Sequence, residues 1–341
     1  MWLRLSLLAV GTLVLSILVW QIGIDAVIAA ATTVGPVGLV LALLPSLAMY
    51  VAEAYGWKLT LGAYARAVSF VRLFAIRTAG EVVNMTTPSA YVGGEPLKAY
   101  LLKRDGVPMV DGLASVVLAK TVMTVAQVVF ILVGIALTFW LVGSERSMAQ
   151  MVMASLVSAG LLSFGLVGLV MVQRWGLFAG GLRLLRRCGV QVAALNAREA
   201  QLQALDETIQ GFYRTDRVKG MLSTGCFLVG WLCEAVEVWA MLAVMGRPIG
   251  VGASLAIGGV SSMIKGGTFF IPGSLGAQDA GNVMLLSAFG YDDVTGLAFA
   301  LLRRFREITW IVIGLLCLAL LGGRQAVTDS ATTSSTIPSG A

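Results

Sequence analysis

The sequence predicts an all-α membrane protein, a polytopic helix bundle with two inverted repeats, each containing a broken, re-entrant helical hairpin. Three observations support this prediction. Of 341 residues, 58% are hydrophobic and 12% charged, with a mean hydropathy of +0.88, a composition foreign to soluble domains. Several apolar stretches are long enough to cross a bilayer. Finally, a set of uncommon residues recurs at one fixed offset along the chain.

Six apolar stretches have the length of a full membrane span, since about 20 helical residues cross the hydrocarbon core. The first is followed by Ala29, Ala30 and Ala31, which resemble a signal-peptide cleavage region. Its length favours a retained first helix instead. In chain order the predicted spans are 5–24, 37–57, 113–142, 151–172, 221–244 and 297–321.

Two further apolar segments, 68–102 and 251–289, are interrupted by glycine and proline. Such segments make poor continuous helices but good helical hairpins, provided that the free backbone groups face protein or water. We therefore expect about six full spans plus two hairpins. The interrupting residues are Gly80, Pro88, Gly93, Gly94 and Pro96 in the first segment, and Gly266, Gly267, Pro272, Gly273 and Gly276 in the second.

Lysine and arginine gather on both sides of the first broken segment and in the loop 174–219. Because positive loops stay in the cytoplasm, we expect both regions and both termini there, in a multi-pass protein of the bacterial inner membrane. The net charge of +6 thus reflects topology, and nucleic-acid binding is not expected. The basic residues near the first segment are Lys58, Arg66, Arg72, Arg77, Lys98, Lys103 and Arg104.

The region 174–219 contains an amphipathic helix, predicted over 192–213. Leu202, Leu205, Ile209 and Phe212 recur at spacings of three and four residues, whereas Asp206 is expected on another face. We interpret it as a cytoplasmic linker helix packed on the bundle, in preference to a partner-binding module. The membrane domain is predicted to cover 1–325, followed by a Ser- and Thr-rich, disordered cytoplasmic tail, 326–341.

An internal repeat is visible when the chain is aligned with itself at a single offset without gaps. The repeat halves are predicted over about 37–142 and 221–322, and the direction of their first spans makes them inverted, as in many transporters. Matches between ionisable residues and prolines carry the argument, because apolar matches are common in this composition. The matching pairs are Glu53 with Glu237, Pro88 with Pro272, Glu95 with Asp279, and Lys120 with Arg304.

The residue types present restrict the chemistry. The chain has no histidine, and its four cysteines show no CxxC spacing. Imidazole proton transfer and His-ligated metal sites are therefore excluded, and the thiols are expected to pack as small apolar groups. We expect no cofactor and no enzymatic activity.

Ionisable residues within the predicted spans are the strongest site candidates. Each costs about 2.5–3.5 kcal/mol at the centre of a membrane helix, so they are expected to pair or to line a wet cavity. At 100° per residue, a single helix face can hold Arg303, Arg304, Arg306 and Glu307, with Arg303 and Glu307 one turn apart. The alternative is an ion-pair network that only fixes helix packing. The residues are Glu53, Lys120, Glu234, Glu237, Arg303, Arg304, Arg306 and Glu307.

The broken segments supply further candidates. Glu81, Asn84, Gly93, Gly94 and Glu95 lie in the first segment. Half-helix N-termini in such hairpins present unpaired N–H groups that attract phosphate or carboxylate. The alternative is a tight hairpin cap in which Glu95 satisfies local amides. The counterpart in the second segment is Pro272-Gly273-Ser274-Leu275-Gly276, followed by Asp279.

These motifs resemble the transmembrane-region family of lysylphosphatidylglycerol synthases, the flippase-like domain. The Arg303-Arg304 and Arg306-Glu307 pairs are further similar to the branch associated with hopanoid biosynthesis. Ser274 and Asp279 depart from the family pattern, which has glycine and glutamate there. The resemblance implies lipid translocation or assistance to a lipid-modifying pathway. The soluble aminoacyl-transferring domain of bifunctional relatives has no counterpart here.

The working hypothesis is a flippase or transporter for a lipid with an anionic head group or of the hopanoid type. Lys120, Arg303, Arg304 and Arg306 would neutralise the head group, and Glu53, Glu95, Glu237 and Asp279 would bind a cationic group or organise these bases. The chain lacks a GxxxxGK[ST] nucleotide motif. Two alternatives stay open: an enzyme or enzyme subunit that modifies a lipid with Glu95 or Asp279 as general base, and an accessory scaffold that binds lipid-biosynthesis enzymes.

Overall fold

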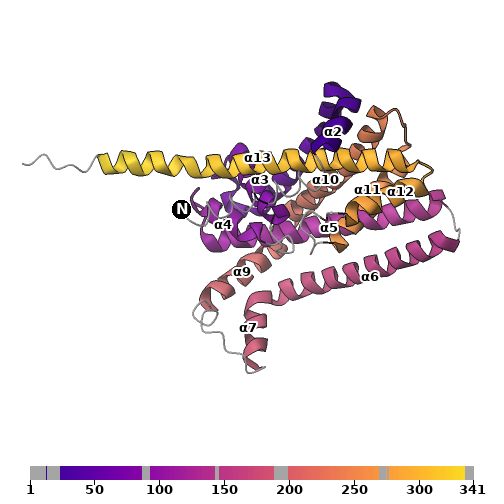
Figure 1. The fold of residues 1–341 in the computed structure, drawn as a ribbon. Helices are drawn as coiled ribbons and strands as arrows, with labels where there is room; N and C mark the ends of the chain where they lie inside the picture. The colour runs from indigo at the N-terminus through magenta and orange to yellow at the C-terminus, as the bar shows by residue number, and fades with distance from the viewer. Residues whose placement is uncertain are drawn as a thin grey trace, which may run out of the picture.

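A computed structural model describes Leu13 and residues 24–86, 93–142, 146–187, 199–268, 274 and 276–334, which form helices and short connections without any strand (Figure 1). The predicted all-α helix bundle is therefore confirmed. Its elements are α2 (Ile24–Thr60), η1 (Gly62–Arg66), α3 (Phe70–Thr86), α4 (Gly94–Lys103), α5 (Met109–Val142), α6 (Arg146–Trp175), α7 (Leu177–Arg187), α9 (Glu199–Thr215), α10 (Arg217–Val244), α11 (Val251–Gly267), α12 (Ala277–Ala288) and α13 (Asp293–Ser334).

Helices α2 and α10 pack against each other. Their close approach depends on a small residue, because a Cβ at Gly56 would lie 3.0 Å from the Phe227 ring. The Ser223 hydroxyl donates to the Gly56 carbonyl across the same contact (2.9 Å). Helix α2 also bends at Gly35, whose φ of 72° is non-helical, directly before a proline.

Three of the helices are long and apolar enough to span a membrane, counted over the residues that the structure describes: Val34–Thr60, Met109–Val142 and Arg217–Val244. They contain the predicted spans 37–57, 113–142 and 221–244. Two more predicted spans, 151–172 and 297–321, are helical throughout, in α6 and α13. The predicted span 5–24 lies outside the described residues except for Leu13 and Ile24.

The two broken segments form equivalent helix pairs. Helices α3 and α4 fill the first segment, and α11 and α12 fill the second. Each pair is followed by a glycine with a φ of 83°, Gly106 and Gly290, which occupy equivalent positions of the repeat. In both turns the next amide bonds back into the preceding helix, as in a Schellman C-cap: Val107 to Leu102 (3.3 Å) and Tyr291 to Leu286 (3.1 Å). The repeated sequence thus adopts a repeated turn.

Helix packing follows the same correspondence. Helix α3 of the first half packs on α13 of the second, and α11 of the second half packs on α5 of the first. Within each half, α4 packs on α5 and α12 on α13. Equivalent helices of the two halves thus make equivalent contacts with the opposite half, as a pseudo-twofold arrangement requires. That the halves are inverted relative to the membrane stays a prediction.

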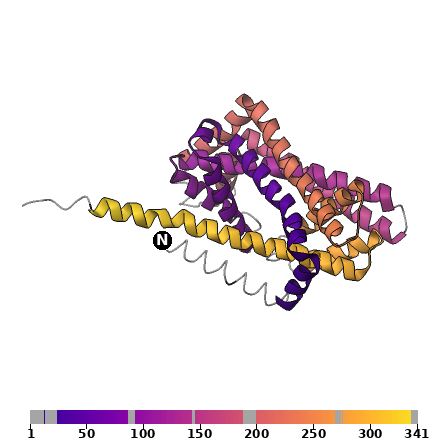
Figure 2. The ribbon, with the colours of Figure 1, turned by 90° about the horizontal axis from the view of Figure 1, so that it is seen from above.

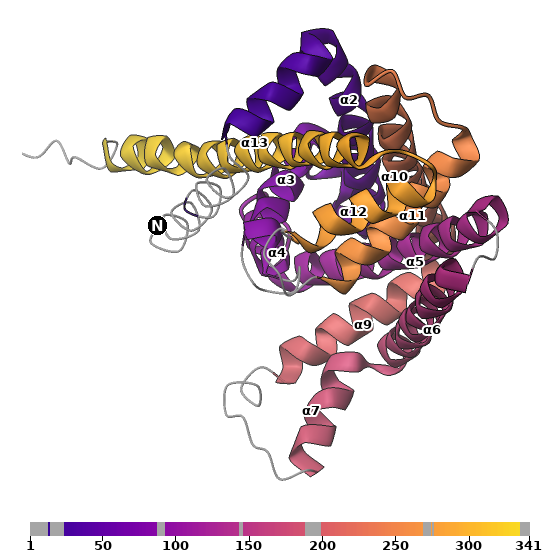
Figure 3. The ribbon, with the colours of Figure 1, turned by 45° about the vertical axis from the view of Figure 1, so that its right-hand side comes forward.

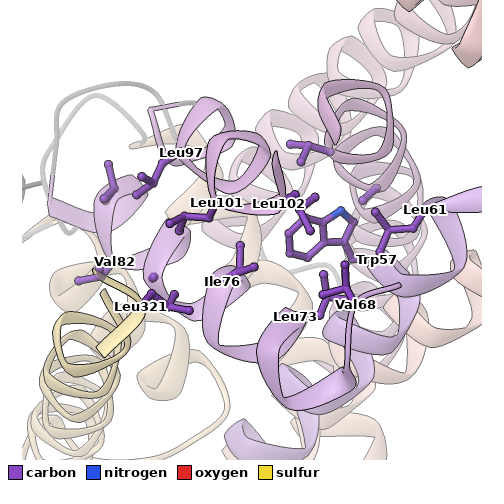
Figure 4. Packing of buried hydrophobic residues seen from close by; sticks show 14 of the residues in the cluster. Trp57, Leu61, Val68, Leu73, Ile76, Val82, Leu97, Leu101, Leu102 and Leu321 are labelled. Atoms are coloured by element: carbon purple, nitrogen blue, oxygen red, sulfur yellow. The ribbon is translucent and has the colours of Figure 1, made fainter. Parts of the chain in front are cut away.

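An apolar core at one end of the bundle holds helices α3 and α4 in place (Figure 4). Leu73 and Ile76 of α3 are fully buried, as is Leu102 of α4. They pack with Trp57 from the end of α2 and with Leu321 from α13. The charged residues one to two turns further along α3 are thereby held at fixed positions inside the bundle.

Helices α6, α7 and α9 lie on one side of the bundle (Figure 3). Leu205, Ile209 and Phe212 bury the apolar face of α9 against α5, so the predicted linker helix packs on the bundle. Asp206, predicted on another face of this helix, is buried, and its carboxylate accepts the Phe178 N–H (3.1 Å). The first turn of α7 has amides without helical partners, and Asp206 satisfies one of them.

Helix α13 passes along the bundle and extends beyond it (Figure 2). It ends at Ser334, so the predicted boundary of a disordered tail at 326 lies inside the helix. Serine and threonine weaken a helix but do not break it, and a strong breaker, Pro338, follows only later in the sequence. At the other end Asp292 accepts the Thr295 amide (2.7 Å), a bond that holds the pKa of the Asp292 carboxyl below its ordinary value.

Candidate functional site

The charged residues of the first half gather on α2, α3, α4 and α5. We call this set the first charge cluster. Glu53 on α2 forms an ion pair with Arg77 on α3, and both side chains are buried. The Arg77 guanidinium also lies over the Tyr50 ring, 4.6 Å from its centroid. The members of the cluster are Glu53, Arg77, Glu81, Glu95, Lys98 and Lys120.

Glu95, in the first turn of α4, is the centre of this cluster. Its carboxylate accepts from Lys98 Nζ (3.0 and 3.1 Å) and from Asn84 Nδ2 (3.1 Å), and Lys120 Nζ lies 3.6 Å away. Glu81 is held less tightly: its Oε2 accepts from Asn84 Nδ2 at 3.4 Å, and Lys98 Nζ lies 3.8 Å away. Glu95 thus joins α4 to α3 through Asn84 and to α5 through Lys120.

The two half-helix N-termini do not present the free amides expected at Gly94 and Gly276. Gly94 N–H donates to Asn84 Oδ1 (2.7 Å), and Gly276 N–H donates to Asp279 Oδ2 (3.0 Å). Side chains of the protein therefore cap both amides, as in the alternative interpretation of a tight hairpin cap. At Gly94, however, the cap is Asn84 and not Glu95. Gly93 directly precedes α4, whereas Pro88, Pro272 and Gly273 lie outside the described residues.

The second half forms a larger and more closed set, the second charge cluster. Arg306 donates to Glu237 (2.9 Å), and Arg303 donates to Glu234 and to Ser261 on α11. The sequence placed Arg303 beside Glu307, but Arg303 turns instead towards α10, where Glu234 offers a carboxylate. The members are Glu234, Glu237, Lys265, Asp279, Arg303, Arg304, Arg306 and Glu307.

Arg304 is the most extensively paired residue of this cluster. Its guanidinium binds both oxygens of Asp279 (2.8 Å each), Glu307 Oε2 (2.6 Å) and the Ser274 carbonyl (3.3 Å). Arg304 with Asp279 is the repeat equivalent of Lys120 with Glu95. In each half, an ion pair at matching positions therefore joins a short helix to the long helix that follows it: α4 to α5 in the first half, and α12 to α13 in the second.

A cavity of ≈ 220 Å³ lies between the two charge clusters. Both hairpins reach it: α3 through Glu81 and Met85, and α11 through Ser262 and Lys265. Lys120 and Arg306 line the cavity, and Arg303 and Arg304 are buried, so these side chains lie inside the bundle. The charged lining residues are Glu53, Arg77, Glu81, Lys120, Glu234, Lys265, Arg306 and Glu307.

Aromatic residues close one wall of this cavity. Tyr50 of α2 stacks on Trp310 of α13, with ring centroids 3.7 Å apart and an interplanar angle of 8°. Trp310 Nε1 donates to the Ser46 hydroxyl (2.9 Å), so the indole joins the two halves through both packing and a hydrogen bond. Methionines, which adapt to irregular ligands, complete the apolar lining at Met49, Met85 and Met123.

A second, larger cavity of ≈ 640 Å³ lies between α5, α6, α9 and α10. Its cationic residues, Arg174, Arg214 and Arg217, are not buried, and no residue of the two charge clusters lines it. We take the smaller, central cavity as the candidate site because buried charge inside an apolar bundle is costly and is retained where function requires it. Within the described part of the chain, no cluster of acidic and sulfur ligands could hold a metal ion.

Three charged residues of the site were missed as site candidates from the sequence. Arg77 and Lys98 were read as cytoplasmic flanking charges, yet both are buried in the first charge cluster. Lys265, 3.3 Å from Glu307, was not singled out. A signal existed for each: Lys98 follows Glu95 by one helical turn, Arg77 precedes Glu81 by one turn, and Lys265 is the repeat equivalent of Glu81.

Comparison with known proteins agrees with this membrane architecture. The family model described as lysylphosphatidylglycerol synthase TM region matches residues 2–317. A UPF0104 membrane protein from Methanothermobacter thermautotrophicus is 22% identical over 314 residues, which cover 90% of this chain and 91% of that protein. No solved structure matches. The chain is an integral membrane protein that belongs to the lysylphosphatidylglycerol synthase TM region family.

Proposed function

We propose that the protein is a flippase or transporter that moves the polar head group of a membrane lipid through the central cavity. The observation that carries the proposal is the cavity lined by charges from both halves inside an apolar bundle. A head group crossing the hydrocarbon core needs such a wet, charged passage, because each unpaired charge there is strongly unfavourable.

The pseudo-twofold arrangement supports the same proposal. Paired repeats allow one half to rock against the other around a fixed midplane site, which exposes the site to each side in turn. The cavity is too small for a whole lipid, since sites that enclose drug-sized ligands have volumes of about 300–1,000 Å³. The acyl chains would stay in the bilayer while the head group passes.

The proposal is tested by lipid scrambling in proteoliposomes. Purified protein is reconstituted with acyl-labelled fluorescent lipids, and loss of fluorescence after reduction of the outer leaflet reports exchange between leaflets. We expect native protein to exceed protein-free vesicles, and Arg304→Ala and Glu95→Ala to lose most of this activity, because each leaves buried opposite charges without their partner.

Arg247→Ala is the matched control, since its ion pair with Asp292 is exposed and lies away from the cavity. This variant is expected to scramble at the native rate. Size-exclusion profiles of all variants identify any that fail to fold. Background-level scrambling by the native protein over a broad lipid panel would contradict the proposal.

A further inference from the structure

We infer that the head group recognised by the central cavity is zwitterionic, with a phosphate held by Lys120 and Lys265 and an ammonium held by Glu81. The inference rests on the proposed function and refines the expectation of an anionic head group. Its first support is charge balance: four basic and four acidic side chains line the cavity. Balanced charge in the cavity is complementary to a head group that carries one charge of each sign.

The second support is which of these eight side chains are available to a ligand. Lys120, Lys265 and Glu81 have 31%, 29% and 24% of their side chains exposed, and they sit at the longer ion-pair distances of 3.6, 3.3 and 3.8 Å. The other five are at most 8% exposed and are held in closer pairs. Two cations and one carboxylate are thus the groups free to rearrange around a ligand.

The third support is the repeat itself. Glu81 and Lys265 occupy equivalent positions of the two halves, on the equivalent helices α3 and α11. Other equivalent charged pairs keep their sign, as Glu53 and Glu237 or Glu95 and Asp279 do. At this position alone among the charged lining residues with a charged equivalent, the sign is reversed. A ligand between the halves therefore meets a carboxylate on one side and an ammonium on the other.

Two buried polar atoms in the cavity wall also point to a ligand. Arg77 Nη1 and Ser262 Oγ have no hydrogen-bond partner among the described residues, although both residues are more than nine-tenths buried and both line the cavity. Buried polar atoms are normally satisfied, since leaving one unpaired costs about 1–3 kcal/mol in general. Ser262 precedes Lys265 by one turn of α11 and can donate to a phosphate held by that lysine, whereas Arg77 lies one turn from Glu81 and does not bear on the phosphate end.

The test compares acyl-labelled lipids with identical tails and three head groups: phosphoethanolamine (zwitterionic), phosphoglycerol (anionic) and a trimethylammonium group without phosphate (cationic). In proteoliposomes, native protein is expected to scramble the zwitterionic lipid at least about tenfold faster than the other two, because a charge-assisted hydrogen bond is lost in each mismatch. This comparison needs no variant and so does not depend on the folding of a mutant.

Two variants then test which residues hold the ammonium and which hold the phosphate of the head group. Glu81→Gln is expected to slow the zwitterionic lipid about tenfold while leaving the anionic lipid unchanged or faster, since only the ammonium loses its partner. Lys265→Gln is expected to slow both phosphate-containing lipids. Asp292→Asn, which removes an exposed carboxylate away from the cavity, is the control and should preserve the native preference.

The outcomes separate the inference from the function that it rests on. Scrambling of the anionic or the cationic lipid as fast as the zwitterionic one would overturn the inference and leave lipid translocation standing. Scrambling of none of the three would overturn both. Uptake of water-soluble phosphoethanolamine into vesicles without lipid scrambling would show that the cavity serves a free solute, and would also overturn the inference.

Discussion

The two charge clusters occupy equivalent places in the two halves but differ in how firmly they hold their members. The second relies on arginines in multiple short contacts, as in Arg304 with Asp279 and Glu307. The first relies at the matching position on Lys120, which has one distant carboxylate at 3.6 Å. Guanidinium groups lock carboxylates bidentately, whereas an ammonium is a mobile point charge. We call the arginine contacts of the second cluster the frame; Lys265 of that cluster, like Lys120 and Glu81 of the first, is more exposed and more loosely paired.

The largest expected effect concerns the frame. Arg306→Leu removes the hydrogen-bonded partner of Glu237, whose side chain is fully buried. We expect the free energy of unfolding to fall by about 3–5 kcal/mol, because the buried carboxylate loses its hydrogen-bonded cation and keeps only Arg303 Nε at 3.7 Å. Denaturant unfolding of the protein in detergent micelles measures this change.

Arg247→Leu is the control for that prediction, since Arg247 and Asp292 are both more than half exposed. Its effect is expected to stay below about 1 kcal/mol, the range of surface ion pairs. Equal losses in the two variants would mean that burial does not distinguish the frame from the surface.

A smaller effect is expected at the contact between helices α3 and α4. A Cβ at Gly94 would overlap the carbonyl oxygen of Gly80, so Gly94→Ala must separate α3 from α4. We expect a loss of about 1–3 kcal/mol, typical of overpacking, together with slower lipid scrambling as Glu95 shifts. Gly112→Ala, whose nearest neighbour would be at 3.5 Å, should be neutral in both measurements.

The smallest expected effect on stability compares the two clusters at one pair of equivalent positions, Arg304 and Lys120. Arg304→Lys keeps the charge but loses the bidentate contact with Asp279, and should destabilise the protein by about 1.5 kcal/mol. The reciprocal Lys120→Arg has room at a partly exposed side chain and should leave the unfolding free energy within about 0.5 kcal/mol of native. Thermal unfolding of both variants checks the difference, and a Lys120→Arg loss as large as that of Arg304→Lys would contradict it.

Much of the architecture could be read from the sequence because the signals are local. Hydropathy located the helices that contain 37–57, 113–142 and 221–244, and glycine and proline marked the two broken segments. The constant offset between the repeat halves agrees with the matching turns that the structure shows at Gly106 and Gly290. Where local rules failed, a tertiary contact overrode them: Asp206 is buried because α7 needs a cap.

The sequence by itself determined that charged residues of this chain lie within apolar helices and recur in two halves, because composition, spacing and repetition are properties of the chain. Only the tertiary structure decided the pairing: Arg306 with Glu237, Arg303 with Glu234 instead of Glu307, and Arg77 and Lys98 inside the bundle. Ion pairs between helices depend on which faces meet, and that choice is made by packing across the whole bundle.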